Sequence, residues 1–459
     1  MKNSTFWVMA GLAGAILGPA GAAILYFVPD PLGLAIVSGL ICFFCFLALP
    51  WLVLPAAMVG GALAAVITGT QVAAGETWMV AATHIGAIAA GTAALTARRI
   101  LGAPRRGRQV RTPADKPMLL LVIVVLIGAL HGLAQDHRPA DVLVAVYQVG
   151  IIPAYFFLAT HTLTTPRRRA AAAITTVAGA LALAAISLAG AGTEAGAEAG
   201  AGIGTARAGG TLSALALVVL AVVAARTSGW RRIGAAAGLV AFAADVVLSG
   251  TQAVWVSTVV ALAVLLLWGS ARLRVRLAVC ALATVLLAAG AAVVSPELSG
   301  RMSTMTGELT QSAGALGPGS AVGLRAFGES PIIGTGFGHS TTDDATPTFT
   351  ASSSGPVYSS FWTTLLANLG LLGLVALLWP LALAGRAGFR DRNGLPLAFV
   401  ALACGFAIGG GLATPAGGHW ELGLLPALTF LAVAAVPAQY LPRPRPEASP
   451  ALQATTGRI

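Results

Sequence analysis

Long apolar segments follow one another along almost the whole chain, and this pattern constrains the fold more than any other feature. Most are about 17 to 25 residues long, the length that an α-helix needs to cross a bilayer. Hydrophobic residues make up 57% of the 459 residues, charged residues only 9%, and the mean hydropathy is +0.85. This composition excludes an ordinary soluble domain, and the lack of period-two alternation excludes an outer-membrane barrel. The sequence therefore predicts an all-α, polytopic transmembrane helical bundle of about fourteen spans.

The basic residues are distributed unevenly between alternate connections. If the N-terminus is cytoplasmic, all of the 27 Lys and Arg residues except Arg138, Arg207, Arg301 and Arg325 lie on the cytoplasmic side. This bias follows the positive-inside rule, and it accounts for the net charge of +11 without nucleic acid as a partner. We therefore expect a multi-pass protein of the cytoplasmic membrane with both termini in the cytoplasm.

Polar segments divide the chain into groups of helices. We expect N-terminal transmembrane helices at 1–99, a basic cytoplasmic linker at 100–116, central transmembrane helices at 117–294, one large extracytoplasmic loop at 295–356, C-terminal transmembrane helices at 357–440 and a disordered cytoplasmic tail at 441–459. Within the central group, the Ala- and Gly-rich stretch 191–210 reads as a flexible exterior loop. Within the large loop, 322–327 predicts a short amphipathic helix that Pro331 terminates.

The large loop also contains a Gly-rich turn with the sequence PIIGTGFGH, from Pro331 to His339. Its glycines, Gly334, Gly336 and Gly338, would let backbone N–H groups approach an anion. The turn is neither a P-loop nor a dinucleotide-binding turn, because no Gly-Lys-Ser/Thr follows and no strand precedes it.

Two arginines of the same loop, Arg301 and Arg325, are candidates to bind a diphosphate, because guanidinium groups bind phosphate bidentately. The alternative is that they contact lipid headgroups or a loop carboxylate such as Glu329. The sequence leaves both interpretations open.

Few other polar groups lie in or beside the predicted spans. Asp245 is a candidate functional carboxylate, because a charge inside a membrane is costly; the alternative is a hydrogen bond to nearby Ser249, Thr251 or Gln252. His419, Trp420 and Glu421 mark the outer edge of the last span, where they could line an exterior cleft. The four cysteines show no metal-ligand spacing, so no metal is expected.

Three segments together resemble the O-antigen ligase and polymerase superfamily. The turn after Leu324 is similar to the family's Pro-hydrophobic-hydrophobic-Gly-x-Gly-x-Gly motif, and the next helix carries a Gly-Leu-Leu-Gly-Leu sequence at 370–374. The start of the tenth span, Thr251 to Trp255, resembles the family's Ser-Arg-Gly-Ala-Trp helix start. The similarity covers roughly 248–385.

The resemblance implies an integral-membrane glycosyltransferase of cell-envelope polysaccharide biosynthesis. Such an enzyme transfers or polymerises polyprenyl-diphosphate-linked glycans at the outer face of the membrane and needs no cofactor. Arginines neutralise the diphosphate leaving group, a role that falls to Arg325 and Arg301. Membrane lipid and other envelope-assembly proteins are further expected partners.

The chain departs from the family pattern at several positions. The family's Ser-Arg-Gly arginine is replaced by Gln252, and the ligases' His-Asn pair by Ser359-Ser360. These replacements favour a polymerase-like member, or one that has lost its catalytic activity. They leave His339 as a candidate base. Two other classes stay open: a lipid-linked oligosaccharide flippase or transporter, and a non-catalytic partner of envelope assembly.

Overall fold

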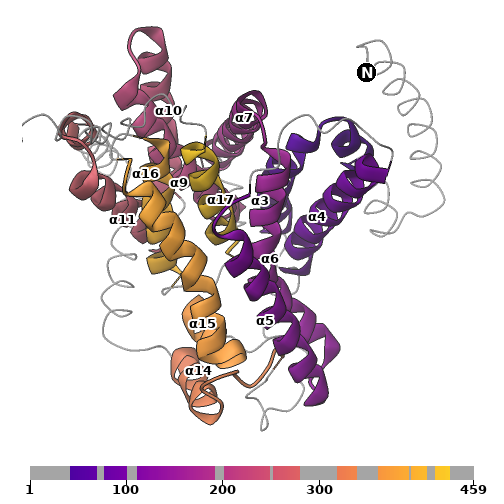
Figure 1. Cartoon of the computed structure of the whole chain (residues 1–459). Helices are drawn as coiled ribbons and strands as arrows, with labels where there is room; N and C mark the ends of the chain where they lie inside the picture. The colour runs from indigo at the N-terminus through magenta and orange to yellow at the C-terminus, as the bar shows by residue number, and fades with distance from the viewer. Residues whose placement is uncertain are drawn as a thin grey trace, which may run out of the picture.

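The computed structural model shows a bundle of helices that pack lengthwise against one another (Figure 1). It describes residues 42–69, 77–100, 111–191, 201–248, 252–279, 318–338, 360–391, 394–410 and 419–434, and these contain helices and turns but no strand. The labelled helices are η1 (Pro50–Leu52), α3 (Val53–Gly69), α4 (Thr77–Ile100), α5 (Asp115–Ala134), α6 (Pro139–Thr162), α7 (Pro166–Ala191), α9 (Ala201–Arg226), α10 (Trp230–Leu248), α11 (Gln252–Trp268), α14 (Pro318–Glu329), α15 (Phe361–Gly388), α16 (Leu395–Gly409) and α17 (Glu421–Val433). Residues 42–48 and 271–279 are also helical.

Five of the described helices are long and apolar enough to cross a membrane. These spans are Asp115–Ala134, Asp141–Thr162, Pro166–Ile186, Gly209–Arg226 and Phe361–Gly388. Shorter apolar helices pack between them, including Gln252–Trp268 and Leu395–Gly409. The predicted all-helical fold is confirmed for the described residues, and helices of this length and hydropathy are typical of membrane proteins. The fourteen spans and the large exterior loop stay predictions.

The Ala- and Gly-rich stretch 191–210 is more helical than its composition suggested. Helix α7 continues to Ala191 and α9 already begins at Ala201. The prediction of a flexible loop over the whole of 191–210 was therefore wrong for 201–210.

Small residues let the C-terminal helices pack closely. Helix α16 lies against both α11 and α17, and α17 in turn lies against α6. A Cβ on Gly405 of α16 would stand 2.2 Å from the carbonyl oxygen of Ser257 on α11, and a Cβ on Gly409 would stand 2.2 Å from the hydroxyl of the same serine. Such glycines allow backbones to approach closely, as is typical of helix pairs in membranes.

Three arginines from separate basic clusters donate to carbonyl groups at the C-terminal ends of neighbouring helices. The pairs are Arg98 with Leu47, Arg169 with Leu431 and Arg276 with Ala225. The last carbonyls of a helix lack partners within the helix and carry its negative dipole end, so a guanidinium stabilises them. In each pair, both groups belong to ends that the charge pattern assigns to the same side of the membrane.

Candidate functional site

The Gly-rich turn is inserted into a break in helix α15. At Gly370 the backbone leaves the helical conformation, with φ 61° and ψ −158°. The amides of Thr335 and Gly336 donate to the carbonyls of Ala367 and Asn368 before the break, at 2.8 and 3.2 Å. After the break, the amides of Leu371 and Leu372 donate to the carbonyls of Pro331 and Ile332, at 2.9 and 3.1 Å. The turn therefore caps both halves of the broken helix, which satisfies backbone groups that a break would otherwise leave unpaired.

The same turn is anchored on helix α5. Phe337 is fully buried, its amide donates to the carbonyl of Gly128, and its own carbonyl lies 2.8 Å from Nδ1 of His137. A Cβ on Gly132 would stand 2.0 Å from the Phe337 carbonyl oxygen, so only glycine permits this contact. The turn thus joins α5 to α15, which lie side by side in the lower half of Figure 1.

The glycines of the turn have a conformational role. Gly334, Gly336 and Gly338 have φ of 73°, 82° and 84°, values that other residues adopt only with strain. The amide of Gly334 donates to Ser330, so the N–H groups of 334–337 all have carbonyl acceptors within the protein. Anion binding at this turn stays a prediction, and those four amides do not supply it.

Helix α14, which carries Arg325, packs on the first half of α15 beside the turn (Figure 1). The contact is made by Ala326, which is buried against Ala367 of α15. Arg325 itself is exposed, as are the apolar side chains of Leu324, Ile332 and Ile333. The expected amphipathic helix over 322–327 is confirmed and is longer than expected.

Three of the predicted site residues, Arg301, His339 and Ser359, lie outside the described residues. The structure therefore places the Gly-rich turn and Arg325 together, and it leaves these three as sequence predictions.

Ser360 and Gln252 both begin helices, and these helix starts lie at the same end of the bundle. The Ser360 hydroxyl accepts from the Thr363 amide at 3.3 Å, so Ser360 is the N-cap of α15. The next amide, that of Phe361, donates to the carbonyl of Gly410 at the end of α16. The preceding residue, Gly409, lies against Ala253 at the start of α11, next to Gln252.

Asp245 is buried between α10 and α9. Its Oδ2 atom accepts a hydrogen bond from the Ser213 hydroxyl at 2.5 Å. This partner lies 32 residues earlier in the chain, whereas the sequence suggested partners within the same helix end. Asp245 thus pairs two helices, and the described contacts do not bring it to the Gly-rich turn.

A second polar group, formed by His419 and Glu421, lies where α15, α16 and α17 meet. Nδ1 of His419 is 2.7 Å from Oε1 of Glu421, and the side chains are only 4% and 3% exposed. The Phe361 ring stands edge-on to the imidazole, with centroids 4.5 Å apart. The sequence placed these residues at an exterior edge, but it gave no sign that they pair or that both are buried.

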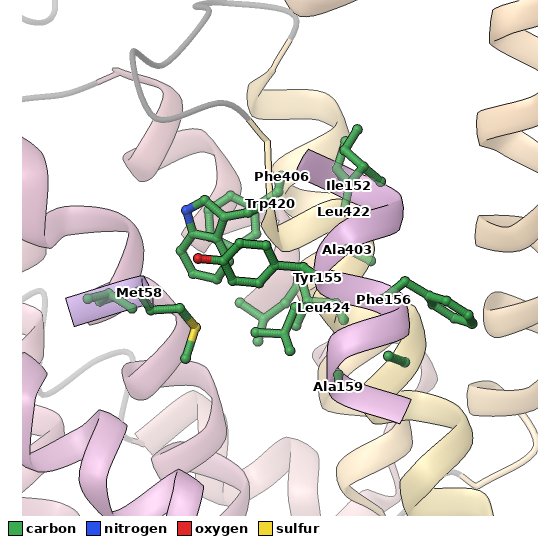
Figure 2. Packing of buried hydrophobic residues seen from close by; sticks show 14 of the residues in the cluster. Met58, Ile152, Tyr155, Phe156, Ala159, Ala403, Phe406, Trp420, Leu422 and Leu424 are labelled. Atoms are coloured by element: carbon green, nitrogen blue, oxygen red, sulfur yellow. The ribbon is translucent and has the colours of Figure 1, made fainter. Parts of the chain in front are cut away.

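Aromatic residues extend this buried group towards α6 and α4. Figure 2 shows the rings of Trp420 and Tyr155 side by side, with the Tyr155 hydroxyl directed away from α6 towards the side where Met58 lies. Their centroids are 5.4 Å apart, and the hydroxyl lies 3.2 Å from Nδ1 of His84 on α4.

Within the described ranges, no three His, Cys, Asp or Glu side chains come together as a metal-ligand set. No protein-family model matches the chain, and no curated protein sequence matches it significantly. The family resemblance therefore rests on the motifs of the chain itself.

Proposed function

We propose that this protein is a membrane glycosyltransferase of the O-antigen ligase and polymerase type, acting on a polyprenyl-diphosphate-linked glycan. In this proposal the Gly-rich turn, α14 and the start of α15 face the outside of the cytoplasmic membrane. The donor lipid diphosphate is the leaving group, so the transfer needs no nucleotide.

The observation that carries the proposal is the joint placement of Arg325 and the Gly-rich turn on the break of α15. The turn and the helix that follows it are the two segments that carry most of the resemblance, and reciprocal hydrogen bonds hold them together. Arg325 is exposed next to them, with exposed Leu324, Ile332 and Ile333 on the same segment. A cation beside exposed apolar side chains suits a ligand with a phosphate head and a hydrocarbon chain.

A transporter is the second candidate, and two observations favour it. Discontinuous helices often form substrate sites in transporters, and α15 is broken at Gly370. Buried acidic groups also mark ion and substrate pathways in transporters, and both Asp245 and Glu421 are buried. We favour the transferase because the break is filled by the turn: the carbonyls of Ala367 and Asn368 and the amides of Leu371 and Leu372 all have partners.

Deletion of the gene followed by analysis of surface polysaccharide and lipid-linked intermediates tests the proposal. A polymerase defect leaves single repeat units on the carrier lipid at the outer leaflet, and a ligase defect leaves complete chains there. A flippase defect leaves the intermediates at the inner leaflet. Unchanged glycans and intermediates contradict both the transferase and the transporter.

Variants of Arg325 test the assigned residue. We expect Arg325→Ala to abolish complementation at normal protein level, and Arg325→Lys to restore part of it, because lysine keeps the charge but not the bidentate geometry. Glu329→Gln is the matched control for the alternative in which Arg325 only pairs with a loop carboxylate. If Arg325→Ala complements fully, or if Glu329→Gln is equally defective, Arg325 does not bind the diphosphate.

A further inference from the structure

We propose that Glu421 and His419 form a general-base dyad, in which Nε2 of His419 takes the proton of the acceptor hydroxyl. The inference rests on the proposed transferase function and names the residue that starts the transfer. The proposed base is therefore His419, next to the start of α17. It replaces the sequence candidate His339, which lies outside the described residues.

The hydrogen bond between the two side chains fixes the direction of the imidazole. An ionised carboxylate can only accept hydrogen bonds, so Nδ1 of His419 must donate to Oε1 of Glu421 across their 2.7 Å separation. In the neutral ring, Nε2 then carries the lone pair. A carboxylate on one ring nitrogen and a free lone pair on the other is the arrangement that a histidine base requires.

Two buried atoms of the dyad lack protein partners. Among the described residues, neither Nε2 of His419 nor Oε2 of Glu421 has a hydrogen-bond partner. Buried polar atoms are rarely left unpaired, because an atom taken out of water without a new partner loses its hydrogen bond to solvent. Two hydroxyls of one sugar could satisfy both atoms, because one would donate its hydrogen to Nε2 and the other to Oε2.

Gly410 lies next to the Nε2 edge of the His419 imidazole. A Cβ at Gly410 would stand 3.2 Å from Nε2, so the glycine keeps this side of the imidazole free of a side chain. The Phe361 ring adjoins the imidazole on another side, with centroids 4.5 Å apart.

The first half of α15 links the dyad to the proposed diphosphate site. Phe361 touches His419, and Ala367 touches Ala326, the neighbour of Arg325. Six residues of helix separate these contacts, which corresponds to about 9 Å. A lipid-linked sugar with its diphosphate at Arg325 could therefore extend its reacting end towards the dyad.

In the proposed step, the acceptor oxygen forms a bond to the anomeric carbon of the donor sugar while its proton passes to Nε2. The bond between the anomeric carbon and the phosphate oxygen breaks, and the polyprenyl diphosphate leaves with the electron pair. The imidazolium is stabilised by Glu421 until it releases its proton to solvent.

Other titratable groups lie near the dyad, and their effect on the pH dependence of the rate has to be distinguished from that of His419 and Glu421. Helix α6 contributes Tyr147 and Tyr155, α4 contributes His84 through Tyr155, and α16 carries Cys404 more than one turn before Gly410. Among the described residues of α15, the contact with His419 is made by Phe361, which does not titrate.

The test uses the full-length protein in proteoliposomes and, as substrate, the lipid-linked glycan that accumulates in the deletion strain. We expect His419→Gln to lower the turnover number about 100- to 10,000-fold, which is the usual contribution of a general base. We expect it also to change the pH dependence of the turnover number from that of the wild type. Glu421→Gln should lower the turnover number with less effect on KM, and Glu421→Asp should restore part of it. His161→Gln, the same change at the far end of α6, is the control and should stay within about twofold of the wild type.

The outcomes separate the two proposals. An inactive wild type on this substrate contradicts the transferase proposal itself. An active wild type with a His419→Gln variant that keeps its rate and its pH dependence refutes only the dyad. If His419→Gln is slow but keeps the wild-type pH profile, His419 is a packing residue and the dyad is equally refuted.

Discussion

Replacing Gly334 by alanine should release the Gly-rich turn from helix α15. Gly334 has φ of 73°, and a left-handed conformation costs an alanine about 1–2 kcal/mol. A Cβ there would stand 2.3 Å from the backbone carbon of Asn368, so the turn and the helix must separate. Separation breaks the hydrogen bonds that Thr335 and Gly336 donate to α15, and each such bond contributes about 0.5–1.5 kcal/mol. Together these terms predict a local destabilisation of about 2–5 kcal/mol.

Hydrogen exchange measures this effect at the turn itself. In the purified protein, the amides of Thr335, Gly336 and Leu371 should exchange at least roughly thirtyfold faster in Gly334→Ala than in the wild type, because about 1.4 kcal/mol corresponds to a factor of ten. Distant helices such as α9 should exchange at unchanged rates. Local opening rather than global unfolding is expected, since α9 packs mainly on other helices, α3, α7 and α10.

Gly328→Ala is the matched control, because this glycine lies in α14 only six residues earlier. No neighbouring atom lies within 4 Å of a Cβ at this position, and its φ is not positive. Alanine is a better helix former than glycine by roughly 1 kcal/mol, so α14 should be unchanged or more stable. If Gly334→Ala exchanges like the wild type, or if both variants open the turn equally, the capping of the α15 break by the turn is refuted.

Three further substitutions test individual contacts through the apparent midpoint of thermal unfolding in detergent. Ser360→Ala should destabilise α15 by about 1 kcal/mol, because the helix loses its N-cap. Ser360→Thr should recover most of this stability. Equal midpoints for the two variants would contradict the role of Ser360 as N-cap. Asp245→Leu should lower the stability by about 1–3 kcal/mol, because it leaves the Ser213 hydroxyl without its acceptor. Asp245→Asn keeps an acceptor and is the control. A Leu variant as stable as the Asn variant would show that α9 and α10 pair by packing alone. Arg169→Gln should lower the midpoint, because it removes the donor to the Leu431 carbonyl. Arg167→Gln removes the same charge from an exposed position and should leave the midpoint unchanged. Identical shifts would assign the effect to net charge.

Parts of the candidate site were predictable and parts were not, for different reasons. The turn at 331–338 follows from its proline and glycines, and the helix around Arg325 follows from local periodicity. The break at Gly370 was not predictable, because Gly-Leu-Leu-Gly inside an apolar run reads as continuous helix. Only the carbonyls and amides of a turn more than thirty residues away make the break stable.

The sequence by itself determined that the chain is helical and apolar enough to span a membrane, because segment length, hydropathy and the alternation of basic clusters are local properties. Tertiary structure alone decided which polar groups become partners. Asp245 meets Ser213 of another helix, and His419 and Glu421 are buried only because α15 and α16 close over the start of α17. The physical reason is that a side chain's burial and hydrogen bonds depend on which helices pack together, and similar apolar helix surfaces carry little information about their neighbours.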